Sequence, residues 1–275
     1  MEKVALITGC SSGIGLHAAQ TLAARGGWRV FASARKEEDV NRLRNDGFAD
    51  VLKLDVDNSV DIQNAMKEVA EKTDGRLDVL FNNAGFGQPG AVEDVGREAL
   101  QAQFRTNVFG AHELATAAVK LMRQKGGGRI IQNSSVLGFV CLKYRGAYNA
   151  SKSALEALTD TMRMELADTD VRIILLQPGP IVSHFRRNAA DAFTRNINEE
   201  DSAHKEIYKQ MRAAWSHEKQ MKFTLPPDAV SAAFLHAVES PSPKSHYRIT
   251  VPTVALWYLK RLLPIKWMDA ILSRS

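Results

Sequence analysis

The sequence predicts an α/β fold in which a doubly wound parallel sheet of about seven strands carries helices on both faces. Short runs rich in Val, Ile and Leu alternate with longer segments of helical periodicity along the 275 residues. Several of these runs are apolar at successive positions, which is typical of strands that helices cover on both sides. Regular alternation of strand and helix indicates right-handed crossovers in a parallel sheet. We expect a single domain over residues 1–275, because α/β folds commonly reach about 250 residues as one unit.

The expected strands are short and rich in branched aliphatic side chains. They cover residues 4–8, 29–33, 51–54, 79–82, 129–133, 171–177 and 247–251. The expected helices place apolar residues three and four positions apart. They cover about residues 14–25, 36–46, 59–73, 97–124 and 148–167.

Charge and cysteine content argue against several classes of protein. Thirty-six Lys and Arg stand against 31 Asp and Glu, which gives a formal net charge of +5. This excess suits an anionic small ligand, and we expect no nucleic-acid partner. Cys10 and Cys141 lie far apart, so neither a disulfide framework nor a metal site is predicted. Because we find no signal peptide and no apolar run of about 18 residues, we expect a cytoplasmic protein.

The alternation of strand and helix breaks after Pro178. Residues 184–225 are mostly helical in pattern and contain several aromatic side chains, where a short crossover would suffice. An insertion near the carboxyl ends of the strands predicts a lid or a substrate wall within the domain. The alternative is a packed surface helix pair.

Residues 253–275 form an amphipathic tail. Leucines, isoleucines and tryptophans alternate there with Lys260, Arg261, Lys266 and Arg274, and Pro264 is expected to kink the helix. Such a segment can lie in a membrane interface, which predicts peripheral contact with the inner membrane face. The alternative is a tail docked on its own domain or on a second subunit.

A glycine-rich turn joins the first expected strand to the first expected helix. It reads Thr8, Gly9, Cys10, Ser11, Ser12, Gly13, Ile14 and Gly15. Glycines allow positive φ and close approach of the backbone to a pyrophosphate, and a helix N-terminus points N–H groups at it. The order strand, turn, helix therefore predicts a Rossmann-like dinucleotide site, with a tight turn that binds nothing as the alternative.

The end of the second expected strand carries information on the cofactor. NAD sites usually place an acidic residue there, about 20 residues beyond the glycines. This chain has Ala34 at that position, followed by Arg35 and Lys36. A guanidinium can bind a 2′-phosphate, so NADP(H) is predicted over NAD(H). The alternative is that Arg35 and Lys36 only begin a solvated helix.

Tyr148 and Lys152 are four residues apart in a segment with an apolar helical stripe. That spacing places both side chains on one face of a helix. An ammonium beside a phenol favours the phenolate, and we expect Lys152 to lower the pKa of Tyr148 from near 10. The pair then suits proton transfer near neutral pH. An ordinary packed tyrosine is the alternative.

Taken together, these motifs resemble those of the short-chain dehydrogenase/reductase family. The matching segments, in the family's order, are TGCSSGIG at 8–15, Asp55, NNAG at 82–85, Asn107, Ser135, YNASK at 148–152 and PGPIVS at 178–183. Within the family the chain looks most like the branch with retinol and hydroxysteroid dehydrogenases and bacterial aldehyde reductases.

The resemblance implies roles for four catalytic residues. Tyr148 would be the general acid in carbonyl reduction and the base in alcohol oxidation. Lys152 would hold the nicotinamide ribose, Ser135 would hydrogen-bond the substrate oxygen, and Asn107 would anchor a water that links Lys152 to solvent.

The resemblance also implies a set of cofactor contacts along the glycine loop and the following strand ends. They are Gly9, Ser11, Ser12, Gly13, Ile14, Gly15, Arg35, Asp55, Asn83, Ala84, Gly85, Tyr148, Lys152, Pro178, Gly179, Ile181 and Ser183. The chain departs from the family pattern in having no basic residue among Cys10, Ser11 and Ser12, so recognition of a phosphate depends on Arg35, alone or with Lys36. Ser183 also stands where the family often has Thr.

The implied substrate is a lipophilic aldehyde or ketone, or the corresponding alcohol. Phe139, Phe185 and Trp215 are expected to line its pocket beside Ser135 and Tyr148, with Leu142, Phe193 and Met211 as further candidates. An NAD-linked dehydrogenase for retinol-like or steroid-like alcohols is one alternative, and a nucleotide-sensing binding protein without catalysis is another. The long apolar helices predict a homodimer or homotetramer.

Overall fold

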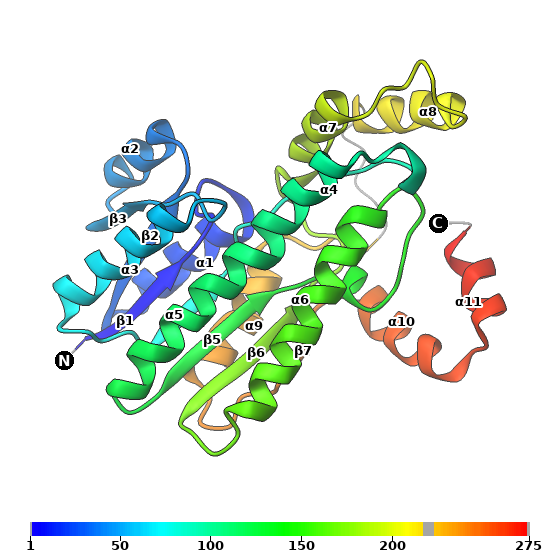
Figure 1. Cartoon of the computed structure of the whole chain (residues 1–275). Helices are drawn as coiled ribbons and strands as arrows, with labels where there is room; N and C mark the ends of the chain where they lie inside the picture. Colours follow the sequence, from blue (N-terminus) through cyan, green and yellow to red (C-terminus); the bar gives the residue numbers. More distant parts are fainter. Residues whose placement is uncertain (1, 217–222, 274–275) are drawn as a thin grey trace.

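A single parallel sheet of seven strands forms the centre of the computed structural model, which describes residues 2–216 and 223–273 (Figure 1). The strand order is β3-β2-β1-β4-β5-β6-β7, with crossovers on either side of β1. The strands are β1 (Lys3–Ile7), β2 (Trp28–Ala34), β3 (Asp50–Lys53), β4 (Val79–Asn82), β5 (Gly128–Asn133), β6 (Val171–Gln177) and β7 (His246–Arg248). This order confirms the predicted doubly wound α/β fold.

Helices cover both faces of the sheet. The described helices of four or more residues are α1 (Gly13–Ala24), α2 (Glu37–Asn45), α3 (Ser59–Thr73), α4 (Arg97–Phe104), α5 (Ala111–Gln124), α6 (Gly146–Glu165), α7 (Phe185–Asn196), α8 (Lys205–Ser216), α9 (Asp228–Glu239), α10 (Val251–Leu262) and α11 (Ile265–Leu272), with a π-helical segment, η2 (Arg105–Gly110), between α4 and α5. Two hydrophobic cores result, one under α1, α2 and α9 and the other under α3 and α5.

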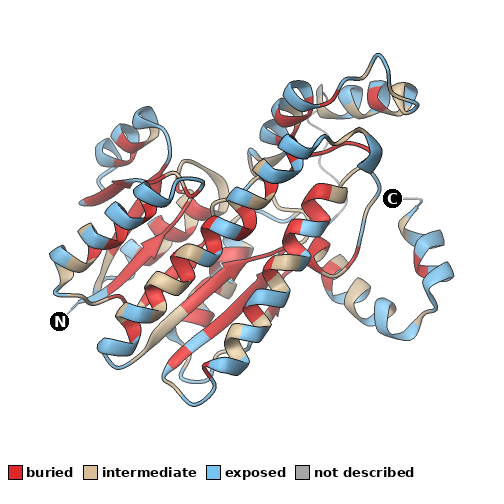
Figure 2. Ribbon diagram, in the orientation of Figure 1, coloured by how far each residue is buried: buried red, intermediate tan, exposed pale blue. Residues whose placement is uncertain are grey.

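Successive residues of each strand supply the two cores alternately. In β1, Ala5 and Ile7 face the core under α1 and α9, whereas Val4 and Leu6 face the core under α3 and α5. All four side chains are almost fully buried, and Figure 2 shows the central strands as the most continuously buried part of the chain. Burial on both faces explains why these strands read as unbroken apolar runs.

Two predicted elements differ from the observed ones, and helix α9 was not predicted. The expected strand 247–251 ends at Arg248, because the Thr250 hydroxyl accepts a hydrogen bond from Thr253 N at 3.3 Å and so begins α10. The expected helix 97–124 contains η2, which places Asn107 in the site described below. Helix α9 was not among the expected elements. It packs on the sheet, where its Phe234 stacks on Phe81 of β4 with ring centroids 4.7 Å apart.

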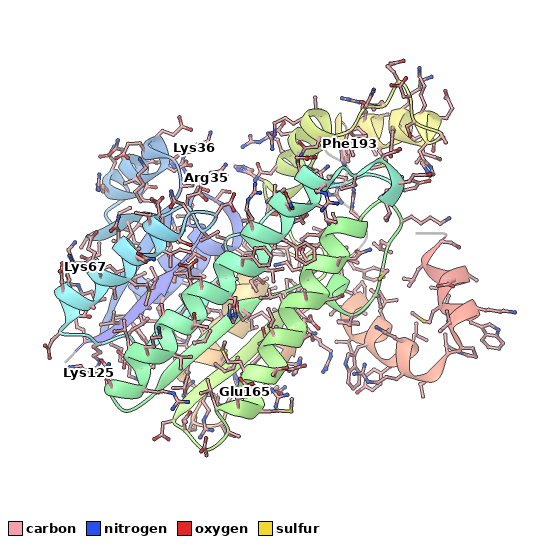
Figure 3. The ribbon with its side chains drawn as sticks, viewed as in Figure 1. Arg35, Lys36, Lys67, Lys125, Glu165 and Phe193 are labelled. Atoms are coloured by element: carbon pink, nitrogen blue, oxygen red, sulfur yellow. The ribbon has the colours of Figure 1, made fainter. Side chains whose placement is uncertain are left out.

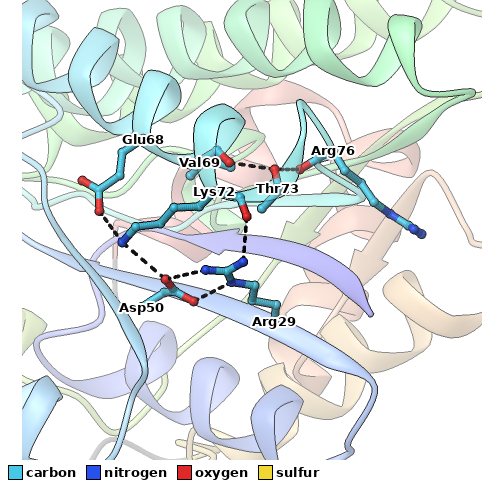
Figure 4. A network of polar contacts seen from close by, with 7 residues as sticks. All are labelled: Arg29, Asp50, Glu68, Val69, Lys72, Thr73 and Arg76. Atoms are coloured by element: carbon cyan, nitrogen blue, oxygen red, sulfur yellow. Dashed lines mark hydrogen bonds and ion pairs between the residues drawn. The ribbon is translucent and has the colours of Figure 1, made fainter. Parts of the chain in front are cut away.

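A polar network ties β2, β3 and α3 together at the outer side of the sheet (Figure 4). Asp50 is buried, and its carboxylate accepts from Arg29 Nε at 2.7 Å and from Arg29 Nη2 at 3.1 Å. Lys72 lies 3.5 Å from the same carboxylate and 2.7 Å from Glu68. The Arg29 and Lys72 partners hold the pKa of Asp50 below its usual range. This network fixes the edge strand β3 and its neighbour β2 beside β1, the strand that leads into the glycine loop.

The insertion and the tail lie beyond the carboxyl ends of the strands (Figure 1). Helices α7 and α8 form an outer pair, and the predicted lid 184–225 includes six residues, 217–222, that lie outside the described residues. The tail is two helices, α10 and α11, with Pro264 between them as predicted. Within residues 2–216 and 223–273, no helix is both long and apolar enough to cross a bilayer.

Candidate active site

The loops that follow β1 and β4 are bonded to each other at the carboxyl edge of the sheet. The Thr8 hydroxyl accepts from Asn83 N at 3.0 Å and from Ala84 N at 2.9 Å. The Asn83 side chain donates back to Thr8 O at 2.9 Å. This reciprocal set fixes the glycine loop against the NNAG segment, at the point between diverging crossovers where doubly wound sheets bind their ligands.

The glycine loop has the geometry of a cradle for an anion. Gly9 and Gly13 have φ values of 71° and 59°, which favour glycine. A Cβ on Gly15 would lie 2.4 Å from both Asn83 Nδ2 and Gly9 O. In the described chain the N-cap Ser12 makes no side-chain capping bond and the first turn of α1 has no acidic residue. The N–H groups of that turn therefore remain available to a pyrophosphate, and the loop fits the phosphates of a dinucleotide.

The turn after β6 approaches the same loop. A Cβ on Gly13 would lie 3.1 Å from Ser183 Cβ, and a Cβ on Gly179 would lie 2.2 Å from Thr250 Oγ1. The predicted residues of the glycine loop, the NNAG segment and the 178–183 turn are thus brought to one edge of the sheet.

The basic residues expected near an adenosine ribose follow the carboxyl end of β2. Arg35 is two-thirds exposed, its Nε lies 4.0 Å from Asp55 Oδ2, and Figure 3 shows it beside Lys36 at this end of the sheet. Arg42 was not predicted as a site residue, yet its guanidinium donates to Ser11 O at 2.6 Å and pairs with Asp39 at 2.7 Å. Arg35 lies outside α2, which begins at Glu37, so no helical spacing in the sequence indicated Arg42.

Tyr148 and Lys152 lie buried on one face of α6, as their spacing predicts. Lys152 Nζ donates to Asn133 O at 2.6 Å and lies 5.8 Å from the centroid of the Tyr148 ring. The Asn133 side chain donates to Asn83 Oδ1 at 2.9 Å. A chain of direct bonds thus connects the lysine to the segment that holds the glycine loop.

Ser135 and Asn107 complete the group. Ser135 hydrogen-bonds Tyr148, and its hydroxyl also accepts from Leu137 N at 3.1 Å. Asn107 accepts from Phe86 N at 3.1 Å and donates to Phe86 O at 2.9 Å and to Ser151 Oγ at 3.1 Å. A Cβ on Gly85 would lie 3.0 Å from Asn107 Oδ1 and 3.9 Å from Lys152 Nζ. All four predicted catalytic residues therefore lie in one neighbourhood.

The model of the short chain dehydrogenase family matches residues 3–193. The chain belongs to this family. It is 43% identical over 273 residues to the uncharacterized oxidoreductase YbbO of Escherichia coli K12, which covers 99% of this chain and 95% of that protein. It is 30% identical over 281 residues to the NADPH-dependent 3-dehydrocapnine reductase of Ornithobacterium rhinotracheale, with 99% and 97% covered. A solved short-chain dehydrogenase of Streptomyces avermitilis superimposes with a TM-score of 0.75 at 26% identity, covering 95% of this chain and 93% of that one.

In the short-chain dehydrogenase family the protonation states of the Tyr–Lys pair are a central question. The sequence predicted a lowered pKa for Tyr148, and this prediction is wrong in this structure. Burial raises the pKa of Tyr148 to about 12, against the lowering effects of the Ser135 hydrogen bond and the Arg145 charge. Burial also lowers the pKa of Lys152 to about 8, against the opposing effect of Glu156. The sequence spacing predicts proximity of the two groups, but it does not reveal how completely both are withdrawn from water.

An apolar cluster surrounds Tyr148 in this short-chain dehydrogenase. Phe185 lies with its ring centroid 5.2 Å from that of Tyr148, and Phe139 and Leu142 belong to the same cluster. The tail supplies much of the remainder, which the sequence had not assigned to the site: Leu256, Leu259, Leu263, Met268 and Leu272. The tail therefore packs on its own domain beside Tyr148.

Trp215 lies elsewhere, which corrects its expected place in the substrate wall. It packs on Phe193 at 5.3 Å between ring centroids, in a separate cluster with Tyr208 and Met211. Tyr208 OH anchors that cluster by accepting from Ala91 N at 2.9 Å. Helices α7 and α8 thus bury their aromatic residues against each other and against the 91–95 loop, so an aromatic residue in the insertion does not by itself indicate a pocket.

Proposed function

We propose that the protein is an NADPH-dependent reductase of lipophilic aldehydes or ketones, able to oxidise the corresponding alcohols in reverse. The observation that carries the proposal is the Tyr148 phenol, which hydrogen-bonds Ser135 and borders an apolar cluster. With a pKa of about 12 the phenol holds its proton throughout the neutral range. It is therefore available to donate that proton to a carbonyl oxygen as negative charge develops there.

The remaining residues of the site would orient the reactants. The cofactor, when bound, supplies the hydride. The glycine loop would hold its pyrophosphate, with Asn83, Ala84, Gly85 and Asp55 beside the adenosine and residues 178–183 beside the carboxamide. Ser135 would hold the substrate oxygen next to the Tyr148 hydroxyl, and Lys152 would hold the nicotinamide ribose. Asn107, in η2, would anchor the water through which a proton reaches Lys152.

The apolar cluster around Tyr148 supports a lipophilic substrate. Its members come from the 137–142 segment, from α7 and from both tail helices. Each methylene that a substrate buries there contributes about 0.8 kcal/mol, or roughly a threefold to fourfold gain in kcat/KM.

A panel of straight-chain aldehydes and ketones tests the proposed function, with NADPH oxidation followed at 340 nm. We expect kcat/KM to rise with chain length, and Phe185→Ala to reduce it more for long substrates than for short ones. Activity confined to small polar sugars would contradict the proposal. Nucleotide binding without turnover of any carbonyl or alcohol would favour a sensing protein instead.

Selection of NADP(H) over NAD(H) is supported by the charge at the outer end of β2. Ala34 occupies the position where a carboxylate would bind the ribose hydroxyls, and Arg35 is exposed next to it. The NADPH dependence in the name of the Ornithobacterium reductase agrees with this assignment.

Replacement of Arg35 by Ala tests the cofactor preference. A charge-assisted hydrogen bond contributes about 1.5–3 kcal/mol, so we expect KM for NADPH to rise by roughly 10-fold or more while KM for NADH is unchanged. Arg44→Ala, on the following helix α2 and bonded to Asn41, serves as the control. Equal effects on the two nucleotides, or a wild-type preference for NADH, would instead indicate an NAD-linked alcohol dehydrogenase.

The tail also presents an apolar outer surface. Leu262, Ile265 and Trp267 are each more than 60% exposed, and Figure 2 shows this surface of α10 and α11 as mostly exposed. Lys260, Arg261 and Lys266 accompany them, against the one acidic residue of the two helices, Asp269. We propose that this surface contacts an anionic membrane at the inner face, next to the pocket that receives the lipophilic substrate.

Self-association is proposed for a different surface. Phe109, Leu158 and Met164 are exposed on η2 and α6. Their exposure supports a cytoplasmic homodimer or homotetramer, in which a second copy would bury these side chains.

A variant with Leu262, Ile265 and Trp267 all changed to Ser separates the two surfaces. We expect the wild-type protein to co-sediment with phosphatidylglycerol vesicles in low salt, and the variant to remain in solution with an unchanged mass by light scattering. Val60→Ser, which alters an exposed apolar residue of α3, is the control. Equal sedimentation of wild type and variant, or a variant that becomes a monomer, would overturn the membrane assignment.

A further inference from the structure

Glu156 is the third member of a series on α6. Tyr148, Lys152 and Glu156 are spaced by four residues, so their side chains follow one face of the helix. Glu156 has no part in the proton transfer described above. It is half-buried among polar groups that belong to the ends of β5 and β6.

The contacts of Glu156 hold its carboxylate in a fixed place. Oε1 accepts from Ser134 Oγ at 2.7 Å and from Gln177 Nε2 at 2.9 Å. Burial raises the pKa of Glu156, and the hydrogen bonds donated by Ser134 and Gln177, together with the Lys152 charge, act against that rise and favour the ionised form. A Cβ on Gly138 would lie 2.2 Å from the same oxygen, so the carboxylate occupies space that only a glycine leaves open.

Lys152 and Glu156 are attached to consecutive residues at the end of β5. Lys152 Nζ donates to Asn133 O, and Glu156 accepts from the side chain of the next residue, Ser134. Among the residues described, no direct ion pair joins Lys152 and Glu156. Their charges therefore act on each other through space, across the end of β5. These attachments to neighbouring residues hold the Lys152 ammonium and the Glu156 carboxylate, one turn apart on α6, in a region from which water is largely excluded.

The electrostatic need for such a carboxylate follows from the burial of Lys152. Burial favours the neutral amine and lowers the pKa of Lys152 to about 8, and Glu156 is the charge that opposes this effect. The other titratable or charged groups around the pair are Tyr148 and Asp160 from α6 and Arg248 from β7. Of these, Asp160 is also paired with Arg163 and with His246, which reduces its effect on Lys152.

We propose that Glu156 is a positioning residue whose carboxylate keeps Lys152 in its ammonium form inside the site. This assignment rests on the proposed role of Lys152 in the reaction. A protonated Lys152 can donate to Asn133 O and to a ribose hydroxyl together, and its charge stabilises developing negative charge on the Tyr148 oxygen. A neutral amine retains fewer donors and no charge.

Glu156→Gln tests the proposal, because its amide oxygen can still accept from Ser134 and Gln177 while the charge is lost. The titration of Lys152 is followed by NMR of the 13C-lysine-labelled protein, with its resonance assigned from Lys152→Arg. We expect the titration midpoint to fall by about half a pH unit or more in Glu156→Gln, and the alkaline limb of the pH–rate profile to move to lower pH with it. Glu156→Asp, which keeps the charge, should restore most of the midpoint.

Asp160→Asn is the matched control, since it removes one negative charge a further turn along the same face. We expect it to move the Lys152 midpoint less than Glu156→Gln does. An unchanged midpoint in Glu156→Gln, or equal shifts in the two variants, would overturn the proposal and leave Glu156 a structural residue. The NMR measurement needs no substrate, so a wild-type protein inactive on every carbonyl would refute the proposed function without affecting this result.

Discussion

The hydrogen bond from Lys152 Nζ to Asn133 O is the interaction on which the rest of the site depends. It joins α6, the helix that carries Tyr148, to the end of β5. From Asn133 the bonds continue through Asn83 to Thr8, at the ends of β4 and β1. Hydride donor and proton donor in this family must meet at one carbon–oxygen bond, so the relative positions of glycine loop and helix must be fixed to within fractions of an ångström. Direct bonds across three neighbouring strands meet that requirement.

Removal from water sets the charges of the site as strongly as its pairwise contacts do. Burial acts in opposite directions on the two central groups, since it favours the neutral phenol of Tyr148 and the neutral amine of Lys152. A protonated phenol suits the reduction of a carbonyl, whereas a charged lysine must be maintained by its neighbours. Glu156, held by Ser134 and Gln177, supplies the opposing charge. The apolar tail adds to the exclusion of water, because its leucines pack in the same apolar cluster as Tyr148 and Phe185.

Local patterns predicted the elements and residues whose identity is dictated by short-range geometry. Unbroken apolar strands, the glycine loop before α1 and the four-residue spacing of Tyr148 and Lys152 are of this kind, and the family and fold they indicated are confirmed. Features that depend on tertiary contacts were not predictable in the same way. Trp215 looked like a wall residue until the packing of α7 on α8 placed it against Phe193, and Arg42 joined the glycine loop only through the docking of α2. The direction of the Tyr148 pKa depended on burial, which a sequence pattern does not measure.

The central claim is that the Tyr148 hydroxyl transfers the proton, and Tyr148→Phe tests it most directly. The ring and its contact with Phe185 remain in this variant, while the oxygen is lost. We expect kcat for the best carbonyl substrate to fall by at least about 10²-fold, with the dissociation constant for NADPH unchanged. Tyr144→Phe, which removes a hydroxyl that lies 3.4 Å from His204 Nδ1, should retain wild-type kcat. Wild-type turnover by Tyr148→Phe would contradict the account.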